Sequence, residues 1–209
     1  MSNSVQGCEE KLAELLGRKY CVWTGNGTSA LYLSFKLCPD QRPKILLPAL
    51  MCIQPMLAVL YAQKIPVFCD VKEEDATIDS DLVEKMLHKD PEIGGVLAVH
   101  LYGNAVHMSK LKKICVKYQV ALIEDLAQAF GGTFEDGSLF GSQGDYSVAS
   151  FGYSKILEIR NNYPYYYEKY IKGNLTRDNL RDNSAKLSKE IKANPVRNWE
   201  IKILTKDLR

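Results

Sequence analysis

Short apolar runs alternate with segments of helical periodicity from residue 8 to about residue 151. The runs are mostly continuous rather than alternating, which is typical of strands that are covered on both faces. They are YCVW (20–23), KILLP (44–48), PVFCDV (66–71), GVLAVH (95–100), VALIED (120–125) and YSVASF (146–151). The segments between them carry apolar residues at helical spacing, and they span residues 8–18, 28–37, 53–63, 79–89 and 108–118.

This alternation predicts an α/β fold with three layers, α/β/α, around a mostly parallel central sheet. Ligands of such sheets bind where the carboxyl ends of the strands meet the loops that follow. Three candidate groups stand at such positions, because GNGTS (25–29) follows the first run, Asp125 closes the fifth and Lys155 follows the sixth. We therefore expect them to face one cleft.

Composition narrows the class of protein. The chain has 209 residues, 46% hydrophobic and 25% charged, with a formal net charge of +2, which predicts one main globular domain and no overall attraction to nucleic acid or membrane. The sequence shows neither a basic and apolar leader nor an apolar run of about 18 residues, so we expect neither secretion nor a membrane span.

The cysteines point to a reducing compartment. They stand singly, without a C-x-x-C pair and without Cys/His spacing for a metal, so we expect no disulfides, no metal site and a cytoplasmic location. The six positions are 8, 21, 38, 52, 69 and 115.

The chain changes character beyond about residue 158. Basic residues outnumber acidic ones there, and NNYPYYYEKY (161–170) concentrates tyrosines. Such a tail permits nucleic-acid binding through stacking and phosphate contacts, but interleaved acids are more typical of a solvated helix face, so we expect no nucleic-acid partner. We predict a domain over 1–158 and a divergent basic tail, or the remnant of a smaller domain, over 159–209.

Lys155 is the only charged residue between Asp145 and Glu158. Its stem could pack on apolar neighbours while its ammonium reaches water, as lysines commonly do. In a small apolar pocket it could instead supply a neutral amine as a nucleophile. Residues 150–157 alone leave both interpretations open.

The other candidate groups have similar alternatives. In GNGTSAL (25–31), Thr28 and Ser29 stand at a helix start with free backbone N–H groups, which suits either a phosphate or an ordinary helix cap. Asp125 at a strand end needs a partner, either a protonated ring nitrogen of a cofactor or a nearby lysine. Gln128 would lie on the same side if the chain turns helically after Asp125.

Taken together, these groups match the requirements of pyridoxal 5'-phosphate (PLP). They comprise phosphate donors that include Ser150, a carboxylate for the pyridinium nitrogen, an amide for the phenolic oxygen, and an amine that forms a Schiff base. A carboxylate held against the ring nitrogen keeps it protonated, so that electrons from a substrate Cα–H bond can flow into the ring.

The order of the motifs resembles a known family. The segments GTSAL, LLPALMC, AVLYAQKIPVFCDV, AVHLYGNAVHMSKLKKI, ALIEDLAQAFGGTF and FGSQGDYSVASFGYSKIL resemble the DegT/DnrJ/EryC1/StrS family of PLP-dependent sugar aminotransferases. The resemblance runs from about residue 5 to residue 158. It implies the large domain of the fold type I aminotransferases, PLP as cofactor, and a homodimer.

The resemblance also implies residue roles. Lys155 resembles the lysine that binds PLP covalently, Asp125 the partner of the pyridine nitrogen and Gln128 the residue near the phenolic oxygen. The remaining positions are the phosphate ligands Thr28, Ser29 and Ser150, and Cys52, which stands where many members have an aromatic residue that stacks on PLP. Stacking is therefore expected to be weaker here. His100, in HLYG, is interpreted as a satisfied histidine near the site rather than a catalyst.

The lysine indicates the reaction type. Family members that act as dehydratases have histidine at this position, so the resemblance implies transamination, with glutamate as amino donor and a nucleotide-linked keto-sugar as acceptor. Lys155 would move the proton between C4′ and the substrate carbon.

Two alternatives stay open. The family normally continues after the lysine into a glycine-rich segment and a small domain, whereas here EIRNNYPYYYEKY follows and only VRNWEIKILTKDLR (196–209) loosely resembles a small-domain strand. The chain could thus be a truncated or degenerate member that binds PLP or a partner subunit without turnover. A Rossmann-type nucleotide binder is weaker, because GNGTSA lacks the G-x-G-x-x-G spacing.

Overall fold

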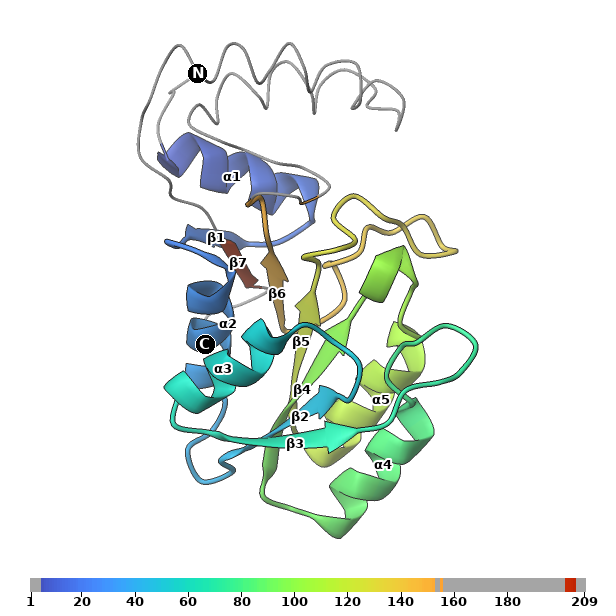
Figure 1. The fold of residues 1–209 in the computed structure, drawn as a ribbon. Coiled ribbons are helices and arrows are strands. Elements are labelled where there is room, and N and C mark those ends of the chain that lie inside the picture. The colour runs from blue at the N-terminus through green and yellow to red at the C-terminus, as the bar shows by residue number, and fades with distance from the viewer. Residues whose placement is uncertain (1–4, 153–154, 156–201, 206–209) are drawn as a thin grey trace.

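The computed structural model describes residues 5–152, residue 155 and residues 202–205 (Figure 1). The helices are α1 (Val5–Leu15), α2 (Gly27–Lys36), α3 (Ile53–Tyr61), α4 (Ser80–Lys89) and α5 (Met108–Tyr118), with a 3-10 turn η1 (Leu101–Gly103). The strands are β1 (Tyr20–Trp23), β2 (Lys44–Pro48), β3 (Ile65–Cys69), β4 (Ile93–Val99), β5 (Ala121–Asp125), β6 (Tyr146–Ala149) and β7 (Lys202–Thr205). The strands and helices predicted between residues 8 and 151 are all confirmed, with ends that differ by a few residues. The helix expected in the basic tail lies outside the described residues.

The strands form one sheet in the order β1-β7-β6-β5-β4-β2-β3. The pairs β6–β5, β5–β4, β4–β2 and β2–β3 are parallel, which confirms the predicted mostly parallel α/β fold. Parallel neighbours bring their carboxyl ends to one edge of the sheet, where the candidate residues follow.

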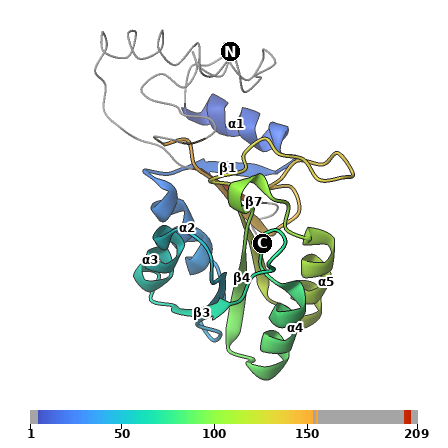
Figure 2. The ribbon, with the colours of Figure 1, turned by 45° about the vertical axis from the view of Figure 1, so that its right-hand side comes forward.

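Two helical layers cover the sheet. Helices α2 and α3 lie on one face, and α4 and α5 lie on the other (Figures 1 and 2). Side chains alternate along each strand, so Ile123 of β5 and Val148 of β6 pack with α2 and α3, whereas Leu122 of β5 packs with α4 and α5. The same alternation decides which layer the acidic residues at the end of β5 face.

The central strand β4 is buried along its whole length and requires glycine at two positions. A Cβ atom at Gly94 would lie 2.3 Å from the carbonyl oxygen of Arg42, and one at Gly95 would lie 2.8 Å from the Cys38 Sγ. Both distances are too short for a real Cβ contact. Glycine therefore lets the segment after α2 approach the sheet closely.

Strand β7 differs from the expectation for the end of the chain. Lys202–Thr205 pairs antiparallel with both β1 and β6, so this segment lies in the large sheet rather than in a separate small-domain strand. The position suits it because β7 supplies hydrogen-bond partners to the facing edges of β1 and β6. The domain boundary near residue 158 stays a prediction, since the rest of 159–209 lies outside the described residues.

Helix α1 covers the remaining apolar surface near β1 and β6. Leu12 packs in a buried cluster with Phe140 and Phe151, which come from the segments on either side of β6. After the helix, Gly17 adopts a positive φ of 61°, and the chain turns into the buried Arg18. This turn delivers a cation into the interior.

The six cysteines all lie in the described part of the chain, and no disulfide joins them. Cys52 is exposed, whereas the other five are buried. Among the described helices, none combines the length and the apolar character that crossing a bilayer requires.

Candidate active site at the carboxyl edge of the sheet

The predicted residues gather around the edge where the parallel strands end. Asp125 is the last residue of β5, and Lys155 and Ser150 follow β6. Ile123 belongs to the cluster under α2 and α3, so the alternation of side chains places Asp125 on the same face. Ser150 shares that face with Val148 by the same rule.

Asp125 is a buried carboxylate with few partners, only 3% exposed. Its Oδ1 accepts a hydrogen bond from the Ala127 N–H at 2.8 Å. Burial raises the pKa of Asp125, while the Ala127 hydrogen bond and the positive charge of Lys155 act in the opposite direction and do not cancel it. The site thus holds an anion that burial disfavours unless a cation binds close by.

Lys155 and Cys52 lie within electrostatic range of Asp125. Lys155 is partly buried, and its backbone N–H donates to the Gly152 carbonyl at 3.2 Å. Although Cys52 is an exposed residue, its thiol is partly desolvated, which raises its pKa; the charge of Asp125 raises it further, and the charge of Lys155 lowers it. The side chains of Lys155, Asp125 and Cys52 therefore lie within electrostatic range of one another, and their roles stay predictions.

The N-terminus of α2 is capped by its own chain. The Asn26 Oδ1 accepts hydrogen bonds from the Ser29 N–H at 2.8 Å and from the Ser29 Oγ at 3.1 Å. Ser29 therefore takes part in the helix cap, which was one of the two interpretations of GNGTSAL. Thr28 lies beside it in the first turn, partly buried. Backbone N–H groups and the helix dipole still make this end suitable for an anion.

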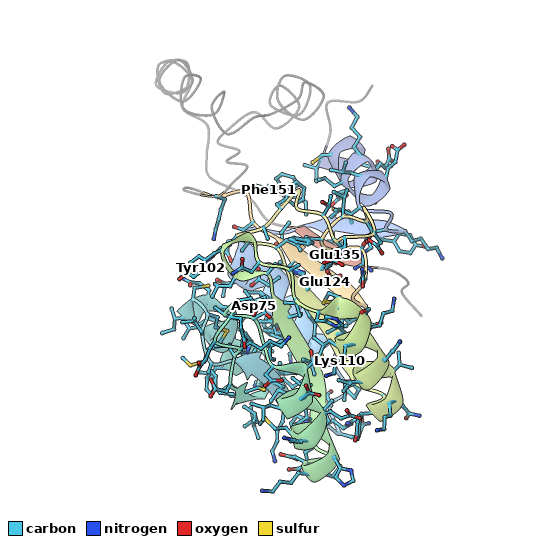
Figure 3. The ribbon with its side chains drawn as sticks, turned by 90° about the vertical axis from the view of Figure 1, so that its right-hand side faces the viewer. Asp75, Tyr102, Lys110, Glu124, Glu135 and Phe151 are labelled. Carbon is cyan, nitrogen blue, oxygen red and sulfur yellow. The ribbon has the colours of Figure 1, made fainter. Side chains whose placement is uncertain are left out.

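Gln128 lies in the turn after β5 and contacts the turn after β4. Its Oε1 accepts from the Tyr102 N–H at 3.2 Å. Tyr102 and Glu124 lie at the same end of the sheet (Figure 3). Ser150 is buried, with 8% of its surface exposed. The functional roles of these residues stay predictions, although their positions agree with one shared edge.

His100 is fully buried, and both of its ring nitrogens have partners. The Val106 N–H donates to Nδ1 at 3.2 Å, so Nδ1 is an acceptor, and the proton on Nε2 faces the Glu124 Oε2 at 3.2 Å. The ring also stacks on Phe140, with centroids 4.4 Å apart. These contacts agree with the prediction of a satisfied histidine near the site.

Sequence reasoning missed a buried network around Glu124. The carboxylate accepts from the N–H groups of Gly141, Gln143 and Gly144 and lies 3.4 Å from the Arg18 Nη2. Burial alone would raise the pKa of Glu124, but the hydrogen bonds from His100 and from these N–H groups outweigh it and lower the pKa.

Arg18 completes the network. It donates to the carbonyls of Gly141 and Gly144 at 2.6 Å each and to the Ser147 Oγ at 2.6 Å. Burial lowers the pKa of Arg18, and the charge of Glu124 counteracts this. The only signal in the sequence is an arginine directly after the glycine that ends α1, which does not reveal a partner 106 residues away.

A sequence profile of the DegT/DnrJ/EryC1/StrS aminotransferase family matches residues 1–159. The chain belongs to this family. The match contains all seven predicted site residues and ends before the tyrosine-rich segment. The mostly parallel sheet and the helices on both faces agree with the fold that the family resemblance implied.

Relatives in the family are named as aminotransferases. The dTDP-3-amino-3,4,6-trideoxy-alpha-D-glucose transaminase of Micromonospora megalomicea subsp. nigra is 34% identical over 158 residues, which cover 75% of this chain and 41% of that protein. The putative pyridoxal phosphate-dependent aminotransferase EpsN of Bacillus subtilis is 28% identical over 158 residues, covering 73% of this chain and 40% of that protein.

A solved structure agrees with this membership. DesV of S. venezuelae, in complex with a ketimine intermediate, superposes with a TM-score of 0.70 at 27% identity and covers 78% of this chain and 43% of that one. The chain thus spans about two fifths of the length of these family members.

Proposed function

We propose that this chain provides the PLP-binding large domain of an aminotransferase that moves an amino group from glutamate to a nucleotide-linked keto-sugar. Family membership supports aminotransferase chemistry, and the name of the Micromonospora relative supports a nucleotide-linked sugar as substrate. The observation that carries the proposal is that Lys155 lies within electrostatic range of the buried carboxylate of Asp125, and that the charges of both act on the Cys52 thiol.

The described residues fit PLP by the chemistry of their donor set. The pKa of the buried Asp125 carboxyl is raised even with the charge of Lys155 nearby, so a protonated pyridine nitrogen would supply a further cation close to it. The N-terminus of α2, with Thr28 and Ser29, suits a phosphate, and Ser150 adds a hydroxyl on the face that α2 covers. Gln128 would hold the phenolic oxygen, and Cys52 would contact the ring without an aromatic stack.

Each residue then has a defined task. When bound, PLP acts as an electron sink for the carbon that carries the amino group of the substrate. Lys155 holds the cofactor and moves a proton at the substrate carbon as general base and acid. Asp125 keeps a proton on the ring nitrogen. Burial around Asp125 excludes water and strengthens this ion pair.

Spectroscopy and chemical trapping test the cofactor. The purified full chain is mixed with PLP, its visible absorption is recorded, and borohydride reduction followed by peptide mass spectrometry locates the modified lysine. We expect a visible band and modification at Lys155. Lys155→Ala should lose both, and Lys113→Ala serves as a matched control that retains them. Modification spread over several lysines, without a visible band, would refute the proposal.

Turnover tests the substrates separately. Glutamate and a dTDP-linked keto-sugar are supplied to the PLP-loaded protein, and formation of 2-oxoglutarate and of the amino-sugar nucleotide is followed. Glutamine and alanine serve as alternative donors. Amino-sugar formation from another donor alone would reject glutamate and leave the PLP assignment intact.

We further propose a homodimer and a cytoplasmic location. Exposed apolar side chains on α3 and on the turn before it support a partner subunit there, namely Leu50, Ile53, Leu60 and Tyr61. The solitary cysteines support a reducing compartment. Light scattering of the purified chain measures the oligomeric state, and a monomer at all concentrations would contradict the dimer.

A second function is a family member that binds PLP or a partner subunit without turnover. The observation behind this alternative is that the family match covers residues 1–159 and does not include the tyrosine-rich segment. A visible band with PLP combined with no transamination from any donor would support this alternative.

A further inference from the structure

Tyr102 has an unusual backbone conformation in the turn after β4. Its φ and ψ are 56° and 18°, in the left-handed region that a residue with a large side chain rarely adopts. The side chain is 74% exposed, so burial of the ring does not offset the cost. The contacts of this residue that depend on the conformation are those of its backbone.

The surrounding turn holds this conformation from two sides. His100 anchors its start through the contact with Glu124 at 3.2 Å. Asn104 anchors its end, because its Nδ2 donates to the Asp75 carbonyl at 2.7 Å. Figure 3 shows Tyr102 and Asp75 on neighbouring loops. Strained residues persist where their surroundings over-determine them, and they concentrate at functional sites.

The strained backbone presents one group to Gln128. The Tyr102 N–H donates to the Gln128 Oε1 at 3.2 Å. Within a glutamine side-chain amide, only the oxygen can accept a hydrogen bond from an N–H group. The bond to Tyr102 therefore fixes which end of the Gln128 amide faces η1. The NH2 group of Gln128 therefore points away from η1. Within the described ranges, this is the hydrogen bond found for the Gln128 side chain.

We propose that Tyr102 is a positioning residue whose main-chain N–H orients the Gln128 amide so that its NH2 group donates to the phenolic oxygen of PLP. The inference rests on the proposed function. If the amide turned over, its oxygen would face the anionic phenolic oxygen, and the contact would become repulsive. The Tyr102 N–H thus decides whether the contact between the Gln128 amide and the phenolic oxygen is attractive or repulsive.

The first test needs no cofactor. Hydrogen exchange of the Tyr102 amide is measured by NMR on the cofactor-free full chain. We expect exchange about tenfold faster in Gln128→Leu than in the wild type, because the acceptor is lost, about 1.4 kcal/mol of protection. Gln128→Glu keeps an oxygen acceptor and should retain the protection. Equal rates in the wild type and Gln128→Leu would overturn the inference.

The second test uses the pH dependence of the visible band of the PLP-loaded protein. A hydrogen bond to the phenolic oxygen withdraws its negative charge and weakens its hold on the proton at the nitrogen linked to Lys155. Loss of the hydrogen bond should raise the midpoint of the pH titration of the visible band by about one pH unit. We expect this in Gln128→Leu and in Tyr102→Val, whose β-branched side chain disfavours the left-handed region.

Matched variants separate backbone from side chain. Tyr102→Gly and Tyr102→Asn adopt left-handed backbone readily and should keep the wild-type midpoint. The double variant Tyr102→Val with Gln128→Leu should shift no further than Gln128→Leu alone. If Tyr102→Val does not fold, as judged by circular dichroism, Tyr102→Ala replaces it.

The outcomes distinguish this inference from the proposed function. A midpoint in Tyr102→Val equal to that of the wild type, with a shift in Gln128→Leu, would overturn the positioning role. A shift in Tyr102→Gly equal to that in Tyr102→Val would assign the effect to the tyrosine ring and also overturn it. Absence of any visible band in the wild type would reject the proposed function, while the exchange measurement would still decide on the bond itself.

Discussion

Glu124 and Asp125 are neighbours at the end of β5, yet the protein treats these two buried carboxylates in opposite ways. Glu124 faces Arg18 and His100 and accepts hydrogen bonds from several backbone N–H groups. Asp125 faces the layer of α2 and α3, where its described hydrogen bond comes from the Ala127 N–H. The pKa of Glu124 is lowered by its partners, whereas burial raises the pKa of Asp125.

The difference indicates a structural role for Glu124 and a functional role for Asp125 on the same strand. A buried carboxylate whose oxygens are fully engaged holds the fold together and offers nothing to a ligand. A buried carboxylate with few partners destabilises the cofactor-free protein, and the binding of a cation beside it stabilises the protein. This property is expected of a cofactor site. The variants below should therefore change stability in opposite directions.

The largest effect is expected at Glu124. Glu124→Ala leaves the Arg18 charge buried without its carboxylate and should lower the free energy of unfolding by about 3–5 kcal/mol. Urea denaturation of the cofactor-free chain measures it. Glu135→Ala, at an exposed position, is the matched control and should change little. A loss below about 1 kcal/mol would mean that the network contributes little to the fold.

The opposite sign is expected at Asp125. Asp125→Asn removes a buried charge with few partners and should raise the free energy of unfolding of the cofactor-free chain by about 2 kcal/mol at neutral pH. The same variant should abolish the visible band and the turnover of the PLP-loaded protein. Destabilisation comparable to that of Glu124→Ala would contradict the comparison.

A smaller loss is expected at His100. His100→Phe keeps a ring to stack on Phe140 but removes the hydrogen bond to Glu124, and it should cost about 1.5 kcal/mol in urea denaturation. His88→Phe on the exposed side of α4 controls for the substitution itself. Unchanged stability would show that the backbone N–H groups alone suffice for Glu124.

The smallest effect is expected in the pH dependence of the free energy of unfolding. Asp125 and Glu124 should contribute slopes of opposite sign, each at most about 1.4 kcal/mol per pH unit. Asp125, whose folded pKa is raised, stabilises the fold most below about pH 4 and loses this contribution as the pH rises through its folded pKa. Glu124, whose folded pKa is lowered, contributes above about pH 4 and loses its contribution as the pH falls.

Urea denaturation at a series of pH values measures both slopes. Asp125→Asn should therefore gain on the wild type as the pH rises, and the deficit of Glu124→Gln should shrink as the pH falls. Parallel curves for all three proteins would refute the opposite signs.

Much of the fold and the site could be predicted from the sequence because both depend on local pattern. Continuous apolar runs indicated the six strands before the tyrosine-rich segment, and helical spacing indicated the helices between them. Since parallel strands end at one edge, the placement of Asp125 near Lys155 followed from chain order alone.

The remainder depends on contacts between distant segments. Arg18 reaches Glu124 and Ser147 only after the sheet has formed, and nothing near residue 18 indicates those partners. The left-handed backbone of Tyr102 arises from anchors at both ends of its turn. Strand β7 was misassigned because four residues do not reveal which strands they will join.

The position of β7 has a consequence for the order of assembly during synthesis. Strand β1 touches the rest of the sheet through β7, which the ribosome makes more than 170 residues later. The parallel strands from β2 to β6 have their neighbours much earlier. The loop that opens α2 therefore follows a strand that can join the sheet only after residues 202–205 have been made, and a nascent chain stalled before residue 202 would leave the edge of β1 unpaired.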